Sequence, residues 1–132
     1  MDDCIFCKII SGDVPCYKIY EDEYVLAFLD INPVVNGHTL VIPKKHFVNI
    51  FDVDNFYLEK VTAAIKKISV HYNQKFDGIN ILNANDKSAQ QSVFHLHFHI
   101  IPRTIDDGKD FWPYKEVLDK TDLKTMAERL KL

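Results

Sequence analysis

The stretch "SVFHLHFHIIPR", residues 92–103, decides how the rest of the sequence is interpreted. His95, His97 and His99 alternate with bulky apolar residues. Such alternation predicts a β-strand, because successive side chains of a strand point to opposite faces. We expect this strand to cover residues 93–101, with the three imidazoles on one face. The other face presents four apolar residues that we expect to pack against a helix: Phe94, Leu96, Phe98 and Ile100.

A row of three histidines has three possible explanations. A solvated sheet face is the first, but such faces usually carry Thr, Lys or Glu. One metal ion shared by all three rings is the second. At 3.3 Å per residue, His95 and His99 lie about 13 Å apart, which is too far for one ion with bonds near 2 Å. Nucleophilic attack on phosphorus is the third, because a neutral imidazole is a good nucleophile near pH 7 and neighbouring imidazolium rings donate to phosphate oxygens.

The segments around this run predict the rest of an α+β domain. Apolar residues at helical spacing predict a short helix at 4–10 and a long amphipathic helix at 53–76. A C-terminal helix at 122–132 begins with an acid and ends with basic residues. Four further strands are predicted, at residues 17–22, 25–30, 38–43 and 79–84. Strands in succession with one long crossover helix indicate a five-stranded antiparallel sheet.

Length and composition exclude several classes of protein. The 132 residues suffice for one domain, 1–132, with its core at 4–103 and a tail and helix at 104–132. A net charge of −3 gives no basic field for nucleic acid or a membrane surface. No run approaches about 18 apolar residues, so we expect no membrane span. Three cysteines without an export signal predict a cytoplasmic protein without disulfides.

Cys4 and Cys7 form a C-x-x-C pair. A thioredoxin-type motif follows a strand, and there is no room for one before Cys4. Buried structural cysteines, a redox pair and a zinc site remain as explanations.

The motif "HLHFHII" resembles His-φ-His-φ-His-φ-φ, the signature of the histidine triad (HIT) family, whose members bind nucleotides and hydrolyse or transfer nucleotidyl groups. Three longer segments are similar to that family as well: "CIFCKIISGDVP", "EDEYVLAFLDINPVVNGHTLVIPKKH" and "QSVFHLHFHIIPR". The resemblance runs from Cys4 to Arg103 and is strongest to bacterial-type members of the nucleoside phosphoramidase branch.

This resemblance implies a role for each residue around the phosphate. His97 would attack the α-phosphorus and form a nucleotidyl-imidazole, with His38 and His99 as flanking donors. Ser92 and Gln91 match positions that contact the phosphate and help the leaving amine. For one nitrogen of His97 to attack, the other must hold a proton against an acceptor, and we expect a backbone carbonyl there.

The resemblance also implies how the nucleoside binds. Asp30 falls at the position that binds the ribose hydroxyls, and a carboxylate is a natural acceptor for a diol. Four apolar residues match the slot for the base, although core packing explains them equally well: Phe6, Ile9, Phe28 and Ile31.

Two positions depart from the family pattern. Gln90 stands where a Gly usually precedes the Gln-Ser pair, and Ala84 stands where an Asn or Gln is usual. Asn83 and Asn85 flank Ala84, and the sequence leaves open which of the two substitutes for the missing side chain; of the two, we assign Asn83 to nucleotide binding. A strand that slips by one residue turns its side chains to the other face, so the departure bears on the handling of the leaving group.

Some relatives bind zinc through this cysteine pair, the His of "PKKH" and the first triad His. The corresponding residues here are Cys4, Cys7, His46 and His95. A closed Cys₂His₂ shell is structural and leaves no open catalytic position. His95 would then serve the metal, while His97 and His99 serve the substrate.

The resemblance implies a hydrolase for purine nucleoside phosphoramidates, with structural zinc, acting as a homodimer through a sheet continued across a two-fold axis. A dinucleoside polyphosphate hydrolase is an alternative within the same chemistry. A regulatory module that binds nucleotide or zinc with little turnover is the alternative from another class. A nucleotidyl-protein trapped during turnover distinguishes an enzyme from a module that only binds.

Overall fold

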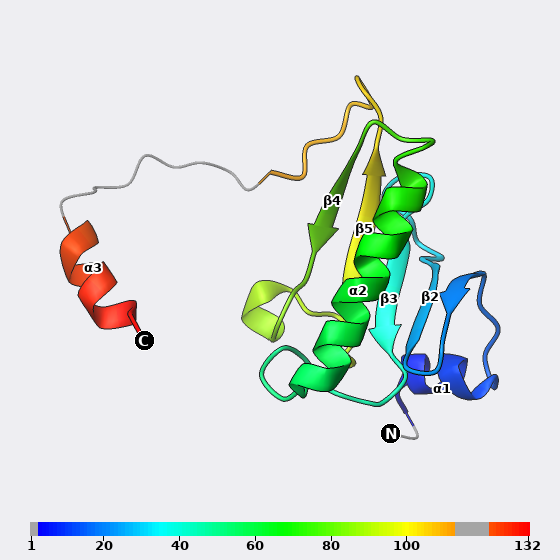
Figure 1. Ribbon diagram of the computed structural model, residues 1–132, viewed down its shortest axis with the longest axis horizontal. Coiled ribbons are helices and arrows are strands. Elements are labelled where there is room, and N and C mark those ends of the chain that lie inside the picture. Colours follow the sequence, from blue (N-terminus) through cyan, green and yellow to red (C-terminus); the bar gives the residue numbers. More distant parts are fainter. Residues whose placement is uncertain (1–2, 113–121) are drawn as a thin grey trace.

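The computed structural model describes residues 3–112 and 122–132, and its architecture is α+β (Figure 1). A five-stranded antiparallel sheet has the order β1-β2-β3-β5-β4. The strands are β1 (Lys18–Glu21), β2 (Val25–Leu29), β3 (Thr39–Pro43), β4 (Gly78–Leu82) and β5 (Phe98–Arg103). The α-helices are α1 (Ile5–Ser11), α2 (Asn55–Tyr72) and α3 (Leu123–Leu130), and a 3₁₀ turn, η1, covers Lys87–Ala89. The predicted fold is therefore confirmed.

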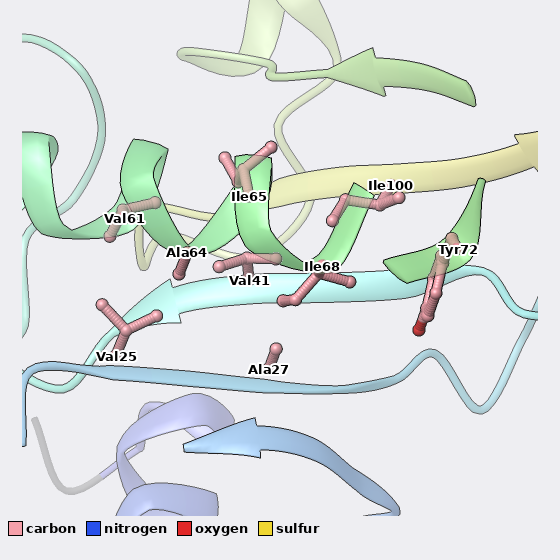
Figure 2. Packing of buried hydrophobic residues seen from close by; sticks show 9 residues of the cluster. All are labelled: Val25, Ala27, Val41, Val61, Ala64, Ile65, Ile68, Tyr72 and Ile100. Carbon is pink, nitrogen blue, oxygen red and sulfur yellow. The ribbon is translucent and has the colours of Figure 1, made fainter. Parts of the chain in front are cut away.

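Helix α2 covers one face of the sheet (Figure 1). It begins after Asp54, whose carboxylate accepts a hydrogen bond from the Tyr57 amide at 2.8 Å. Its buried side chains recur every three or four residues and pack on those of three strands (Figure 2). The helix contributes Val61, Ala64, Ile65, Ile68 and Tyr72, and the strands contribute Val25, Ala27, Val41 and Ile100. Full burial of one such aliphatic side chain stabilises the fold by about 1.5–3 kcal/mol.

Helix α1 covers the opposite face. There Phe6 packs with Leu26 and Phe28 of β2 and with Leu40 and Ile42 of β3. Both central strands are thus buried on both faces, which explains why they are unbroken apolar runs rather than alternating ones.

The predicted fifth strand is wrong at its beginning. Residues 93–97 lie outside the sheet, and β5 begins only at Phe98. The reason is at the end of β3: Pro43 has no N–H for a ladder, and its carbonyl oxygen lies 2.9 Å from the His95 ring nitrogen Nε2. Phe94 is consequently 40% exposed and does not pack against a helix, whereas Phe98 and Ile100 belong to the α2 core.

The other predicted elements differ from the observed ones by at most four residues at an end, the largest difference being α2, which ends at Tyr72. Helix α3 has no buried residue. Residues 113–121 of the predicted tail lie outside the described residues. Within the described part of the chain, no helix combines the length and hydropathy that crossing a bilayer requires.

Candidate active site and metal centre

A cavity of about 410 Å³ opens on the α1 side of the sheet. Its wall contains the four residues expected for the base slot: Phe6, Ile9, Phe28 and Ile31. Phe6 and Phe28 belong also to the core, whereas Ile31 is 79% exposed. Core packing and cavity lining are therefore not exclusive for these residues.

Among the wall residues that the sequence analysis did not single out are Val14, Pro15 and Cys16. They follow α1 directly, after Gly12 ends that helix at a φ of 87°. A left-handed glycine at a helix end turns the chain back, and that signal could have identified this wall.

His97 is buried at the polar end of the cavity. Its Nδ1 lies 2.7 Å from the carbonyl oxygen of His95, and since a carbonyl only accepts, Nδ1 carries the proton. Burial lowers the pKa of His97, so the ring is neutral and Nε2 keeps its lone pair. The backbone acceptor predicted for His97 is thus confirmed, in a tautomer suited to nucleophilic attack.

His38 and His99 form a chain of hydrogen bonds with one direction. The amide of Val34 donates to His38 Nδ1 at 3.2 Å, so the His38 proton is on Nε2. That Nε2 donates to His99 Nδ1 at 2.8 Å, which leaves the His99 proton on its own Nε2.

Both rings of this chain are neutral. Burial lowers the pKa of His38, and burial with the neighbouring His97 and His38 lowers the pKa of His99 to about 4. In the free protein the neutral rings are therefore favoured, with N–H groups as the available donors, and donation to phosphate as imidazolium stays a prediction.

Asp30 follows β2 at the cavity wall. Its Oδ1 accepts from the Asn32 amide at 2.8 Å, and its Oδ2 lies 3.6 Å from His38 Nε2. Asp30, His38 and His99 lie close enough for a metal ion. However, His38 has no free lone pair for it, because Nδ1 accepts from Val34 and Nε2 is protonated.

A second cluster joins Cys4, Cys7, His46 and His95, whose candidate ligand atoms all lie within 4.8 Å of one another. His95 Nε2 donates to the Pro43 carbonyl, so its Nδ1 lone pair faces Cys4 Sγ at 3.5 Å and Cys7 Sγ at 3.6 Å. Burial and the neighbouring Cys4 raise the pKa of the Cys7 thiol to about 11, an effect that a bound cation would reverse. This donor set and its carbonyl-bound histidine suit zinc.

The cavity wall includes Ser92, whereas Gln91 is buried outside the cavity. Gln91 Nε2 donates to the carbonyls of Val48 and Val93, and its Oε1 accepts from the Asp86 amide. In this structure the Gln91 amide therefore holds two loops together, and a contact with phosphate stays a prediction.

The two departures from the family pattern have different structural meanings. Gln90 has a φ of 68°, in the left-handed region where glycine is favoured, so its side chain is accommodated with strain. Near Ala84, Asn83 directs its Nδ2 to the carbonyl oxygen of His97 at 2.9 Å and does not line the cavity. A nucleotide contact of Asn83 stays a prediction as well.

Comparison with known sequences agrees with this geometry. A model of the HIT domain matches residues 11–105. An uncharacterized HIT-like protein of Borreliella burgdorferi is 52% identical over 115 residues, 84% of this chain and 83% of that protein. Adenosine 5'-monophosphoramidase HNT1 of Saccharomyces cerevisiae is 42% identical over 115 residues, 86% of this chain and 72% of that protein.

Solved structures show the same fold. The crystal structure of a HIT family member from Bacillus subtilis has a TM-score of 0.86 at 44% identity, over 97% of this chain and 94% of that one. A zinc-bound histidine triad family protein from Mycobacterium smegmatis has a TM-score of 0.80 at 40% identity, over 87% and 85%. By its sequence, its fold and its row of histidines, the chain belongs to the HIT domain family of nucleotide-binding hydrolases.

Proposed function

We propose that the protein is a purine nucleoside phosphoramidase that works through a nucleotidyl-His97 intermediate. One observation carries this proposal: His97 Nδ1 donates to the His95 carbonyl, which leaves the Nε2 lone pair beside a cavity that also contains Asp30 and His99. A neutral nucleophile with a fixed tautomer needs no deprotonation before it attacks.

The reaction proceeds in two displacements. The Nε2 lone pair of His97 forms a bond to the α-phosphorus while the phosphorus–amine bond breaks. The amine leaves with the bonding pair and takes a proton, for which the Ser92 hydroxyl at the cavity wall is the donor we favour. Water then attacks phosphorus and returns a proton to the Ser92 oxygen, the bond to Nε2 breaks with its electron pair going back to the His97 ring, and nucleoside monophosphate is released. The Nε2 proton of His99 stabilises charge on the non-bridging oxygens.

Binding of the nucleoside divides between the polar and apolar ends of the cavity. The Asp30 carboxylate accepts the two ribose hydroxyls. A two-ring base packs in the slot of Phe6, Ile9, Phe28 and Ile31, since aromatic and aliphatic walls favour a large planar group. The similarity to an adenosine 5'-monophosphoramidase supports a purine nucleotide.

Zinc at Cys4, Cys7, His46 and His95 completes the proposal. The zinc-bound relative from Mycobacterium smegmatis and the close approach of these four side chains support it. When bound, a four-ligand zinc ion supplies structural stability, because no coordination position stays open for substrate.

A homodimer is also part of the proposal. The sheet ends at β4, where Ile81 is 50% exposed and Leu82 is 40% exposed. An apolar edge strand with unpaired backbone groups favours pairing with the same strand of a second copy.

One experiment tests the proposed phosphoramidase against its two rivals, a dinucleoside polyphosphate hydrolase and a regulatory module with little turnover. Adenosine 5'-phosphoramidate and a dinucleoside polyphosphate are each mixed with the protein, quenched within one turnover and analysed for a nucleotidyl adduct on His97. A phosphoramidase forms the adduct faster from the phosphoramidate, a polyphosphate hydrolase forms it faster from the other substrate, and a regulatory module forms none.

The variant His97→Ala sharpens this test. We expect turnover to fall at least about a thousandfold while nucleotide affinity changes less than about tenfold, because a nucleophile acts mainly in the transition state. His71→Ala, which changes an exposed histidine of α2, is the matched control. More than a few per cent of wild-type turnover in His97→Ala would exclude His97 as the nucleophile.

A further inference from the structure

The main chain around His97 lacks the support that a strand would provide. Residues 93–97 precede β5, and the ladder of β5 with its neighbours begins at Phe98 on β3 and at His99 on β4. A reacting atom displaced by about 1 Å can cost a hundredfold in rate, so some other contact must fix this backbone.

Just before His97, the Leu96 amide donates to the Phe47 carbonyl at 2.7 Å. At His97 itself the contact comes from Asn83, which Asn85 holds in turn. Asn83 Nδ2 donates to the carbonyl oxygen of His97 at 2.9 Å. Asn85 Nδ2 donates to Asn83 Oδ1 at 2.6 Å. The bond from Asn85 matters because an amide has a donor end and an acceptor end. With Oδ1 held by Asn85, Asn83 must present its N–H₂ group to His97.

Asn85, the second asparagine of this hydrogen-bonded pair, is bonded in turn to a loop that is distant in sequence. The Ile50 amide donates to Asn85 Oδ1 at 2.8 Å, across 35 positions of the chain. That loop is itself fixed, since the amides of Val48 and Asn49 both donate to the Asp52 carboxylate, at 3.0 and 2.9 Å. A rigid turn thus connects through two side chains to the peptide of the nucleophile.

We propose that Asn85 is a positioning residue, which fixes the orientation of the Asn83 amide and thereby the main chain of His97. This inference rests on the proposed function of His97. Neither asparagine lines the cavity. Loss of Asn85 therefore slows attack on phosphorus and leaves nucleotide binding intact.

Substitution Asn85→Asp isolates the donor. A carboxylate still accepts from the Ile50 amide, but it faces Asn83 with an oxygen instead of an N–H. Asn55→Asp is the matched control, because it makes the same change of atom and charge at an exposed residue at the start of α2. Asn85→Ala is a second variant without the added charge, and thermal melting verifies that each variant is folded.

Two measurements are made on each protein. The first is the rate of nucleotidyl-His97 formation in one turnover, together with the dissociation constant for AMP. We expect Asn85→Asp and Asn85→Ala to form the adduct about tenfold to a hundredfold more slowly, with the AMP constant within twofold of wild type. The second is the NMR signal of the His97 Nδ1 proton, which we expect to exchange with water at least threefold faster in both variants.

The outcomes separate the positioning role from the proposed function. If wild type forms no adduct but the Nδ1 proton exchanges faster only in the Asn85 variants, the proposed function fails and the positioning role stands. An unchanged exchange rate, or adduct formation within twofold of wild type in both Asn85 variants, overturns the positioning role. Equal slowing in Asn55→Asp overturns it as well, because charge alone would then account for the effect.

Discussion

The two ends of the histidine row are held by different kinds of contact. His99 lies in β5 between Leu40 of β3 and Leu82 of β4, so its direction follows from the strand. His95 and His97 precede the strand, and their rings bond to the carbonyls of Pro43 and His95.

This difference explains how His97, the proposed nucleophile, obtains its tautomer. In a strand ladder, the carbonyl of His95 would accept from a neighbouring strand's amide. Because the chain leaves the sheet there, that carbonyl is available to the His97 ring. The strand therefore fixes the direction of the His99 side chain. The irregular segment before it fixes which nitrogen of His97 carries the proton.

The largest expected effect on the irregular end comes from removing Cys4, a proposed zinc ligand whose Sγ lies 3.5 Å from His95 Nδ1. We expect Cys4→Ser to lose zinc and to unfold with a free energy lower by roughly 3 kcal/mol or more, a decrease in Tm on the order of 10 °C. Elemental analysis and melting with and without a chelator measure this. Cys16→Ser, which alters a cavity cysteine outside the cluster, should keep both its metal and its response to chelator. Wild type that contains no metal and melts identically with chelator would contradict the prediction.

The second prediction concerns His99, at the strand end of the row, and the loss of folding stability at low pH. Burial lowers the pKa of His99 to about 4, below its ordinary value of 6.5, so the folded state favours the neutral ring. Above about pH 6.5 the effect costs no stability, because the ring is neutral in both the folded and the unfolded chain. As the pH falls toward 4, the unfolded chain binds a proton that the folded state does not, and the free energy of unfolding declines by about 2–3 kcal/mol. Chemical denaturation at several pH values should show a flatter profile for His99→Gln than for wild type. His71→Gln is the control, and a profile of His99→Gln parallel to wild type would refute the assignment.

Asp30, beside the strand end, should distinguish ribonucleotides from 2'-deoxyribonucleotides in binding. Asp30→Asn replaces a charged acceptor by an amide, and we expect ribonucleotide affinity to fall by about 2 kcal/mol, roughly thirtyfold. The 2'-deoxyribonucleotide should lose clearly less, because it has one hydroxyl fewer to offer. Calorimetric titration of both nucleotides measures the difference. Equal losses would mean that Asp30 does not contact the diol.

The smallest expected effect concerns the loop before the irregular end. Gln90→Gly should raise the free energy of unfolding by about 0.5–1 kcal/mol, because glycine adopts a φ of 68° without strain. Gln74→Gly, at a residue without positive φ, should lower it by a similar amount. Urea denaturation compares the two, and a loss of stability in Gln90→Gly would show that its side chain contributes more than the strain costs.

The sequence predicted those parts of the molecule that depend on local pattern. Helical spacing located α2, and apolar runs located β2 and β3, because each side chain has a neighbour at a fixed interval. The cysteines and histidines of the candidate zinc cluster could be brought together through the family resemblance, and the structure places their candidate ligand atoms close to one another.

The remainder depended on contacts that pattern does not encode. Alternation continues through residues 93–97 even though the strand does not, because the end of the ladder is decided by Pro43 in another strand. The residue types of Gln91 and Asn83 were identified, but not the direction of their amides, which depends on Val48 and Asn85.

The hydrogen bond from Val34 to His38 gives the histidine end of the cavity a polarity that starts from a backbone amide. One peptide N–H decides which nitrogen of His38 is a donor, and His38 decides the same for His99, so the position of the His99 proton depends on the Val34 amide. The backbone conformation of the turn before β3 therefore determines which ring nitrogens of His38 and His99 carry protons. Two homologues with identical histidines but a different turn would present opposite faces, lone pair or proton, to the same phosphate.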